Sequence, residues 1–243
     1  MSGTRPPAFE SAERRDIYAY VERHGTAEPR EVWEHCQLEP ADFHHQLAML
    51  RRDGYLEKVD GKLRVVLEAG AEETYETHEF SFAIRPARQE DLSSVLGAIR
   101  TVVDERRYVV AETVAEQLHH ENVLVRRNDR HRRLFFVATV DAEVVGWAHV
   151  QAPELGKLRH TAELTVGVLE SYRRHGIGSH LLSRGLQWAA ASGYEKVYNS
   201  LPATNADGVG FLVENGWTIE AVRSGHYRLG RERVDEVMLA YAV

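Results

Sequence analysis

The spacing of apolar residues predicts two structural parts along the chain. In the first part, apolar positions recur with helical spacing in three segments, residues 11–23, 29–35 and 40–52. The third segment shows this most clearly, because Phe43, Leu47 and Leu50 fall on one helical face. Two short strand-like runs follow, at 56–59 and 63–66, and Asp60-Gly61 between them is a strong hairpin signal. This part therefore reads as three helices followed by a β-hairpin.

The second part, residues 80–243, alternates between strand-like and helix-like patterns. The pattern predicts strands at 82–85, 134–140, 144–150, 161–168, 196–201, 218–227 and 234–241. Helical periodicity predicts helices at 89–103, 111–119, 176–192 and 205–215. Strands interleaved with helices in this order indicate an α/β protein with a mixed sheet.

An acidic stretch separates the two parts. Residues 68–79 are rich in glutamate and have no apolar periodicity, so we interpret them as a linker. The sequence therefore predicts a small N-terminal domain at 1–67 and a larger domain at 80–243. A length of 243 residues is sufficient for both to bury a core.

Composition narrows the class of protein. With 43% hydrophobic and 28% charged residues, the chain has the composition of a soluble globular protein. It lacks any run of roughly 18 apolar residues and begins without a signal-peptide pattern, so we expect a cytoplasmic protein that does not enter membranes. Cys36 is the single cysteine, which excludes an intrachain disulfide and a thiolate metal cage. A net charge of -7 argues against a chain devoted to nucleic acid.

The order of elements over about residues 8–67 resembles a winged helix-turn-helix domain. A DNA-binding domain of this kind would place its third helix in the major groove and offer His44, His45, Gln46, Arg51 and Arg52. Residues 1–68, however, contain 10 Arg or Lys and 13 Asp or Glu. Because phosphate contacts supply most non-specific affinity, an acidic domain is a poor DNA binder by itself. The alternative is a module that binds a protein partner or forms a homodimer.

The segment 166–179, V-G-V-L-E-S-Y-R-R-H-G-I-G-S, carries the clearest chemical signal. An apolar strand stops at Leu169, and Arg173-x-x-Gly176-x-Gly178 then opens an amphipathic helix. Two glycines let the backbone approach a ligand closely, and the first helical N–H groups have no intrahelical acceptor. Those donors, the positive end of the helix dipole and the neighbouring arginines suit a pyrophosphate.

Other readings of this turn fit less well. A dinucleotide-binding fingerprint would need a third glycine where Leu181 stands, and a P-loop would need Gly-Lys-Ser or Gly-Lys-Thr. An ordinary strand-to-helix turn with two glycines is the plain alternative as long as this segment is considered alone.

Two further strings extend the signal beyond the turn. Leu164-Thr-Val166-Gly-Val168 precedes it, and Asn205 with Phe211-Leu-Val-Glu-Asn-Gly216-Trp217 follows it. With the order of elements, they resemble the GNAT superfamily of acetyl-CoA-dependent N-acetyltransferases over about residues 80–243. The resemblance implies the mixed-sheet acyl-CoA N-acyltransferase fold and direct acetyl transfer from acetyl-CoA to a primary amine, on a small molecule or a protein. The alternative function is a transcriptional regulator whose winged helix binds DNA and whose acetyl-CoA fold senses the coenzyme.

The resemblance also implies a coenzyme site. Its expected members are Val166, Val168, Arg173, Arg174, His175, Gly176, Ile177, Gly178, Ser179 and Asn205. In this superfamily the R-x-x-G-x-G turn holds the pyrophosphate, and the strand before it splays from its neighbour after a bulge. The pantetheine arm would then pair with the exposed backbone of Val166 and Val168. The Val168 N–H would polarise the thioester carbonyl and stabilise the developing oxyanion, and Asn205 would contact the arm.

Acetyl transfer to an amine needs a group that accepts a proton. Glu163 lies ten residues before Arg173, where several members of the superfamily carry a glutamate base, so it is the candidate base. A solvated strand residue, or one that only binds substrate, is the alternative reading of Glu163. The tyrosine that often protonates the leaving thiolate is replaced by Leu212. Tyr198 and Tyr227 lie on neighbouring predicted strands, and the general acid stays unassigned.

The acceptor amine is the least determined part. The resemblance places specificity in the first helices and their connection at 104–108, where acidic residues could attract an amine and arginines could hold a carboxylate. A solvated helix end is the plain alternative. The adjacent pairs His44-His45 and His119-His120 diverge by about 100° on a helix, so neither is a bidentate metal site and no metal is expected.

Overall fold

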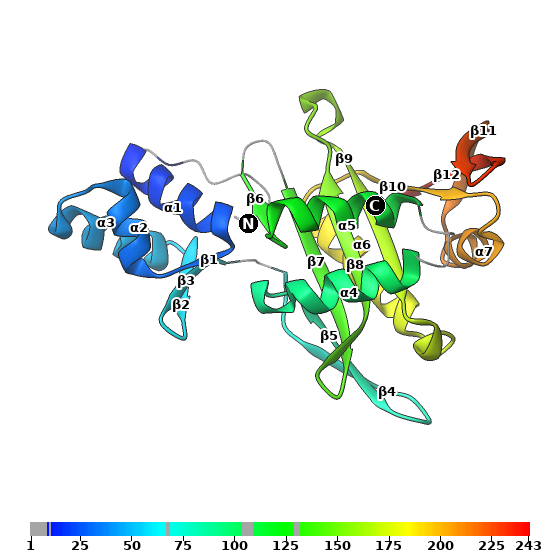
Figure 1. Ribbon diagram of the computed structural model, residues 1–243, viewed down its shortest axis with the longest axis horizontal. Coiled ribbons are helices and arrows are strands. Elements are labelled where there is room, and N and C mark those ends of the chain that lie inside the picture. The colour runs from blue at the N-terminus through cyan, green and yellow to red at the C-terminus, as the bar shows by residue number, and fades with distance from the viewer. Residues whose placement is uncertain (1–8, 10, 67–68, 104–108, 129–131) are drawn as a thin grey trace.

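The computed structural model describes residues 9, 11–66, 69–103, 109–128 and 132–243. Figure 1 shows a small, mainly helical unit at one end of the molecule and a large sheet covered by helices beside it. We call them the N-terminal module (residues 11–66) and the sheet module (residues 69–243). Among the described residues, no helix is long and apolar enough to span a membrane.

The N-terminal module contains three helices and a three-stranded sheet. Its elements are α1 (Ala12–His24), β1 (Thr26–Ala27), α2 (Pro29–Cys36), α3 (Pro40–Arg52), β2 (Leu56–Val59) and β3 (Lys62–Val65). The strand order is β1-β3-β2, so the predicted hairpin gains a third strand. The three predicted helices and the hairpin are confirmed. β1 has only two residues, which is too short for a periodic pattern to reveal.

Local chemistry explains where these elements begin and turn. The Ser11 side chain accepts a hydrogen bond from the Arg14 N–H and caps α1. The hairpin turns at Asp60 and Gly61, whose φ values of 50° and 84° match a two-residue turn that requires positive φ at both positions. Ile17, Val32, Leu50 and other apolar side chains then close a core between the helices and the sheet.

The described residues of the sheet module form nine strands. They are β4 (Glu73–Glu76), β5 (Ser81–Pro86), β6 (Arg126–Arg127), β7 (Arg132–Val140), β8 (Glu143–Ala152), β9 (Thr161–Val168), β10 (Lys196–Pro202), β11 (Thr218–Leu229) and β12 (Glu232–Ala242). Their order is β11-β12-β10-β9-β8-β7-β5-β4, with β6 paired to β7. β9 and β10 are parallel and the other neighbours are antiparallel, which confirms the predicted mixed sheet.

Helices cover both faces of this sheet. α4 (Leu92–Val103) and α5 (Val109–Glu121) cross the near face in Figure 1, and α6 (Ile177–Ala191) lies behind it. α4 and α5 bury one apolar cluster with Phe135 and Trp147 of the sheet. α6 packs on the other face against Leu164 and Val168. α7 (Ala206–Glu214) follows β10 on the side of α6.

The structure differs from the sequence prediction in the acidic stretch, at one helix start and at the two-residue strand β6, which was not predicted. Residues 73–76 of the predicted linker form β4, which pairs with β5 from Glu73↔Ile84 to Glu76↔Ser81. The strand escaped detection because three of its four side chains are exposed and two of the four are glutamates. The predicted helix at 89–103 begins as a 3-10 turn at Gln89–Asp91 before α4. The domain boundary itself stays a prediction.

A buried carboxylate joins the two modules. Glu22 of α1 is 5% exposed. Its carboxylate accepts hydrogen bonds from the Arg127 N–H (3.1 Å) and the Asn128 Nδ2 (3.0 Å), and it lies 3.6 Å from the Arg126 guanidinium. Tyr18 donates to the Arg127 carbonyl at 2.9 Å. Because a buried charge is stable only with such partners, these bonds fix α1 against β6.

A glycine is also required at this junction. Gly25 has a φ of 74°, and a Cβ placed there would lie 2.4 Å from Oε1 of Gln89. Gln89 cannot easily move, because its Nε2 donates to the Asn122 carbonyl (2.7 Å) and its Oε1 accepts from the Leu124 N–H (3.2 Å). Close approach of the two modules thus depends on the missing side chain at Gly25.

Gly25→Ala and Gly54→Ala provide a matched test of this contact. Both glycines have a φ of 74°, but a Cβ at Gly54 would meet no atom within 4 Å. Both substitutions should lose about 1–3 kcal/mol of unfolding free energy through backbone strain, because each glycine has a positive φ. Gly25→Ala should lose about 1–3 kcal/mol more, because Gln89 must give up its hydrogen bonds. Urea denaturation measures both losses. Equal losses would contradict the proposed close contact.

Candidate functional site

β9 loses one of its two neighbours halfway along its length. It pairs with β10 only at Thr161↔Lys196, Ala162↔Val197 and Glu163↔Tyr198. On its other side it stays paired with β8 from Glu163↔Gln151 to Val168↔Gly146. The second half of β9 therefore borders an opening between the strands, as the sequence predicted. The register with β8 is unbroken there, so the expected bulge in β9 is absent from this ladder.

The hydrogen-bonding pattern shows which backbone groups border the opening. The Leu169 N–H donates to the Val145 carbonyl at 2.9 Å. In an antiparallel ladder, alternate residues bond to the partner strand, so Gly167 and Thr165 face β8. Val166 and Val168 then direct their N–H and carbonyl groups into the opening. Arg173 Nε donates to the Val168 carbonyl at 2.9 Å, which occupies one of these groups.

The glycine turn lies at the end of the same strand. After a 3-10 turn at Glu170–Tyr172 the chain passes Arg174, with a φ of 67°, and Gly176, with a φ of 82°, before α6 begins. The first intrahelical bond runs from the His180 N–H to the Gly176 carbonyl at 3.1 Å. Earlier N–H groups in this turn have no acceptor inside the helix, as is typical of turns that bind anions.

A cleft of about 430 Å³ connects the opening with the turn. Most of the predicted coenzyme residues line it, namely Val166, Val168, Arg173, Arg174, Gly176, Gly178, Ser179 and Asn205. His175 and Ile177 are not among its lining residues. The Ile177 side chain is buried in the core under α6, and the His175 ring packs 4.9 Å from the Phe80 ring.

The N-terminus of α7 forms the far wall of the cleft. Asn205 is 1% exposed and caps this helix, because its Oδ1 accepts a hydrogen bond from the Gly208 N–H at 3.0 Å. Asp207 in the first turn lies 4.0 Å from the Arg174 guanidinium. The cleft also has lining residues that the sequence analysis did not single out, among them Asn199, Leu201 and Gly210.

Glu163 lies on the face of the sheet opposite the cleft. A Cβ at Gly167 would collide with Trp147, which packs under α4 and α5, so alternation puts Glu163 on that same face. Leu164 points the other way, toward Gly185 of α6. The Glu163 side chain is partly buried beside Tyr198, and this burial raises the pKa of its carboxyl.

The structure gives no general acid for the leaving thiolate among the described residues that line the cleft. Leu212, next to Phe211, stands at the position where the superfamily often has a tyrosine. Tyr227 donates its hydroxyl to Glu236 at 3.0 Å, and burial followed by the hydrogen bond to Glu236 raises its pKa. Burial raises the pKa of Tyr198 as well. Neither tyrosine lines the cleft.

The connection at 104–108, where acceptor specificity was expected, lies outside the described residues. Glu112, an acidic residue that follows it on α5 and could also attract an amine, is exposed. Within the described ranges, no three His, Cys, Asp or Glu side chains are grouped as a metal site requires. The expectation that no metal takes part stays a prediction.

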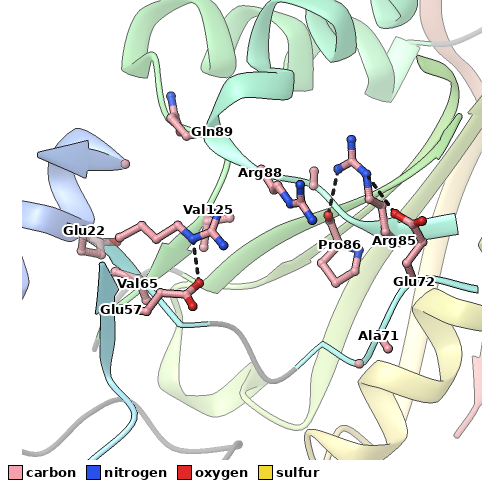
Figure 2. A pocket seen from close by; sticks show the side chains of 14 residues that line it. Glu22, Glu57, Val65, Ala71, Glu72, Arg85, Pro86, Arg88, Gln89 and Val125 are labelled. Atoms are coloured by element: carbon pink, nitrogen blue, oxygen red, sulfur yellow. Dashed lines mark hydrogen bonds and ion pairs between the residues drawn. The ribbon is translucent and has the colours of Figure 1, made fainter. Parts of the chain in front are cut away.

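A second cavity, of about 260 Å³, lies at the junction of the two modules. Figure 2 shows its charged side chains facing one another. Arg64 pairs with Glu57 at 2.6 Å, and Arg85 lies 3.7 Å from Glu72. Glu22, which also lines the cavity, is held by Arg126. Because each lining carboxylate already has an arginine partner, this cavity belongs to the junction rather than to the candidate active site.

A mixed sheet with an opening between two parallel strands, next to a glycine turn at a helix N-terminus, is the arrangement expected of acyl-CoA-dependent transferases. Comparison with known families agrees: residues 99–217 match the model of the acetyltransferase (GNAT) family. The chain therefore carries a GNAT acetyltransferase domain, and the predicted acetyltransferase is confirmed. No curated protein sequence matches the chain significantly.

Solved structures share this fold. A GNAT-family acetyltransferase from Streptococcus pneumoniae aligns with a TM-score of 0.56 and 19% identity, over 67% of this chain and 99% of that one. A ribosomal-protein-alanine N-acetyltransferase from Brucella melitensis aligns with a TM-score of 0.54 and 23% identity, over 66% of this chain and 99% of that one. A putative acetyltransferase from Salmonella typhimurium, solved with acetyl-CoA, aligns with a TM-score of 0.54 and 18% identity, over 66% of this chain and 93% of that one. At these identities the likeness concerns the fold.

Proposed function

We propose that the protein binds acetyl-CoA in the 430 Å³ cleft and transfers its acetyl group directly to a primary amine. The observation that carries this proposal is the open edge of β9. Val166 offers an N–H and a carbonyl there, and Val168 offers an N–H. Pantetheine contains amide groups, and it would complete the sheet as an added strand does. The Val168 N–H is the donor assigned to the thioester carbonyl and to the charge that develops on it.

The turn before α6 is the proposed site of the coenzyme pyrophosphate. Free N–H groups at a helix N-terminus and the helix dipole stabilise negative charge, and Arg173 and Arg174 line the same end of the cleft. Arginine binds phosphate oxygens with two parallel donors, which favours a fixed orientation of the group. In this assignment His175 and Ile177 contribute through their backbone at most.

Glu163 is the proposed general base. Its carboxylate would accept the proton of the attacking nitrogen while that nitrogen bonds to the thioester carbon and the carbon–sulfur bond breaks. The electron pair of that bond leaves with the coenzyme thiolate. Support comes from the position of Glu163 beside the point where β9 and β10 separate, on the face away from the coenzyme cleft. The amine would therefore approach from the side of α4 and α5.

The N-terminal module supports a second candidate function. We propose that it is a winged helix-turn-helix domain, because its helices are followed by a hairpin that pairs with β1. α3 lies at the far end of the module from the sheet in Figure 1, and His44, His45, Arg51 and Arg52 on it are exposed. In the regulator alternative, this helix binds DNA and the coenzyme cleft senses acetyl-CoA.

Gly178→Asp tests the coenzyme turn. The new carboxylate would stand in the cleft at the proposed pyrophosphate site, where like charges repel. Thiol release from acetyl-CoA with an amine identified in a screened panel should fall below detection in this variant. Gly97→Asp is the control, since Gly97 is exposed on α4 and has no atom within 4 Å of its Cβ position. Activity that survives in Gly178→Asp would refute the assigned turn.

Glu163→Gln tests the base. The variant should lose about 10²–10⁴-fold in kcat/KM, because the amide cannot accept the proton. Burial raises the pKa of Glu163, so wild-type activity should fall as the pH drops through that raised pKa, and the activity of the variant should not fall in this way.

The raised pKa also has a consequence for stability. The carboxyl of Glu163 is compatible with folding when it is protonated at low pH, and it destabilises the folded state once it is ionised. The variant should then be the more stable protein at neutral pH, measured by urea denaturation.

The control for this experiment is Glu195→Gln, because Glu195 is exposed after α6. It should retain both the wild-type rate and the wild-type pH profile. An unchanged pH profile in Glu163→Gln would assign the base to another group.

A mobility-shift experiment with the full-length protein tests the regulator alternative. Sequence-selective binding of genomic fragments should change with acetyl-CoA and be lost in Arg51→Glu, since Arg51 is exposed on α3. Arg30→Glu serves as the control, because Arg30 belongs to α2 and pairs with Glu34. The same shift with and without acetyl-CoA would exclude a sensor.

A further inference from the structure

Asn199 stands where β9 and β10 separate. It is 4% exposed and comes one residue after Tyr198, the last residue of β10 that pairs with β9. Its Nδ2 donates to the Leu164 carbonyl of β9 at 2.7 Å. The side chain thus replaces the next backbone bond of the ladder and closes the inner end of the opening.

This bond fixes the orientation of the Asn199 amide. A backbone carbonyl can only accept a hydrogen bond, so the NH₂ group must face Leu164 and the Oδ1 must face away. The Oδ1 is buried and, among the described residues, has no hydrogen-bond partner. Asn199 is also one of the residues that line the coenzyme cleft. A buried amide oxygen without a donor costs about 1–3 kcal/mol, which a bound ligand could relieve.

The position of Asn199 in the sheet selects the ligand. Alternation along β10 puts Asn199 on the same face as Val197 and Leu201, which pack in the cluster under α6 and α7. Tyr198 shares the opposite face with Glu163, from which the amine is proposed to approach. The free Oδ1 is therefore on the coenzyme side of the sheet. The pantetheine arm is the part of the coenzyme that carries amide N–H groups.

We propose that Asn199 is a positioning residue for acetyl-CoA, whose Oδ1 accepts a hydrogen bond from an amide N–H of the pantetheine arm. Its Nδ2 holds the end of β9 in place, so one side chain both shapes the opening and fixes the arm within it. This inference rests on the proposed coenzyme site. Its signal in the sequence is a polar residue at an inward-facing position between Val197 and Leu201.

Calorimetric titration of the full-length protein with two probes tests the proposal. The first probe is coenzyme A, and the second is 3′-phosphoadenosine 5′-diphosphate, which has the same phosphates but no pantetheine. Asn199→Leu should weaken coenzyme A binding about tenfold, the equivalent of one lost hydrogen bond, and leave binding of the nucleotide unchanged. Equal affinity of the variant and the wild type for coenzyme A would overturn the assignment. An equal loss for both probes would also overturn it, since the effect would then be structural.

Asn215→Leu is the matched control. Asn215 also donates its Nδ2 to a backbone carbonyl, that of Phe211 at 2.8 Å, but it is not among the residues that line the cleft. Its variant should bind coenzyme A as the wild type does. If Asn199→Leu fails to fold, Asn199→Ala allows the same comparison with a smaller side chain. A wild-type protein that does not bind coenzyme A would refute the proposed function itself, which separates the two failures.

Discussion

The parting of β9 and β10 is the feature on which the rest of the site depends. A strand inside a sheet normally satisfies its N–H and carbonyl groups on both sides. β9 does so only as far as Glu163, after which β8 is its single neighbour. The backbone groups of Val166 and Val168 are thereby left for a ligand. The Asn199 side chain ends the ladder with β10 at Leu164, so the opening has a defined inner end.

Neighbouring side chains of β9 point into different layers on the two faces of the sheet. Leu164 faces α6, on the side of the sheet that holds the cleft, while Glu163 faces the layer of α4 and α5. Gly167 makes this arrangement sterically possible, because any Cβ there would overlap the Trp147 ring. Under the proposed function, donor and acceptor reach the same strand from opposite faces. A carboxyl with a raised pKa beside the opening then suits proton transfer at the meeting point.

Polar contacts hold the N-terminal module against the sheet module. Glu22 is buried among groups of the segment 126–128, and Gly25 allows Gln89 to approach closely. Removing a carboxylate from water is costly, so the contact is stable only in the one geometry that supplies all of its partners. The cavity beside it is lined by arginine–carboxylate pairs, which are consistent with a specific docking of the two modules.

Local sequence patterns were sufficient for the helices, for most strands and for the glycine turn, because periodicity and positive φ are properties of neighbouring residues. Gly176 and Asn205 therefore predicted where α6 and α7 begin beside the cleft. Neither β4, which pairs through exposed acidic residues, nor the roles of Glu22 and Asn199 could be read in this way. Each of these depends on a partner that is distant along the chain, such as Leu164 for Asn199. The sequence by itself determined the kind of fold and the position of the glycine turn before α6. Only the tertiary structure decided which buried polar atoms lack partners, because that depends on where distant strands part.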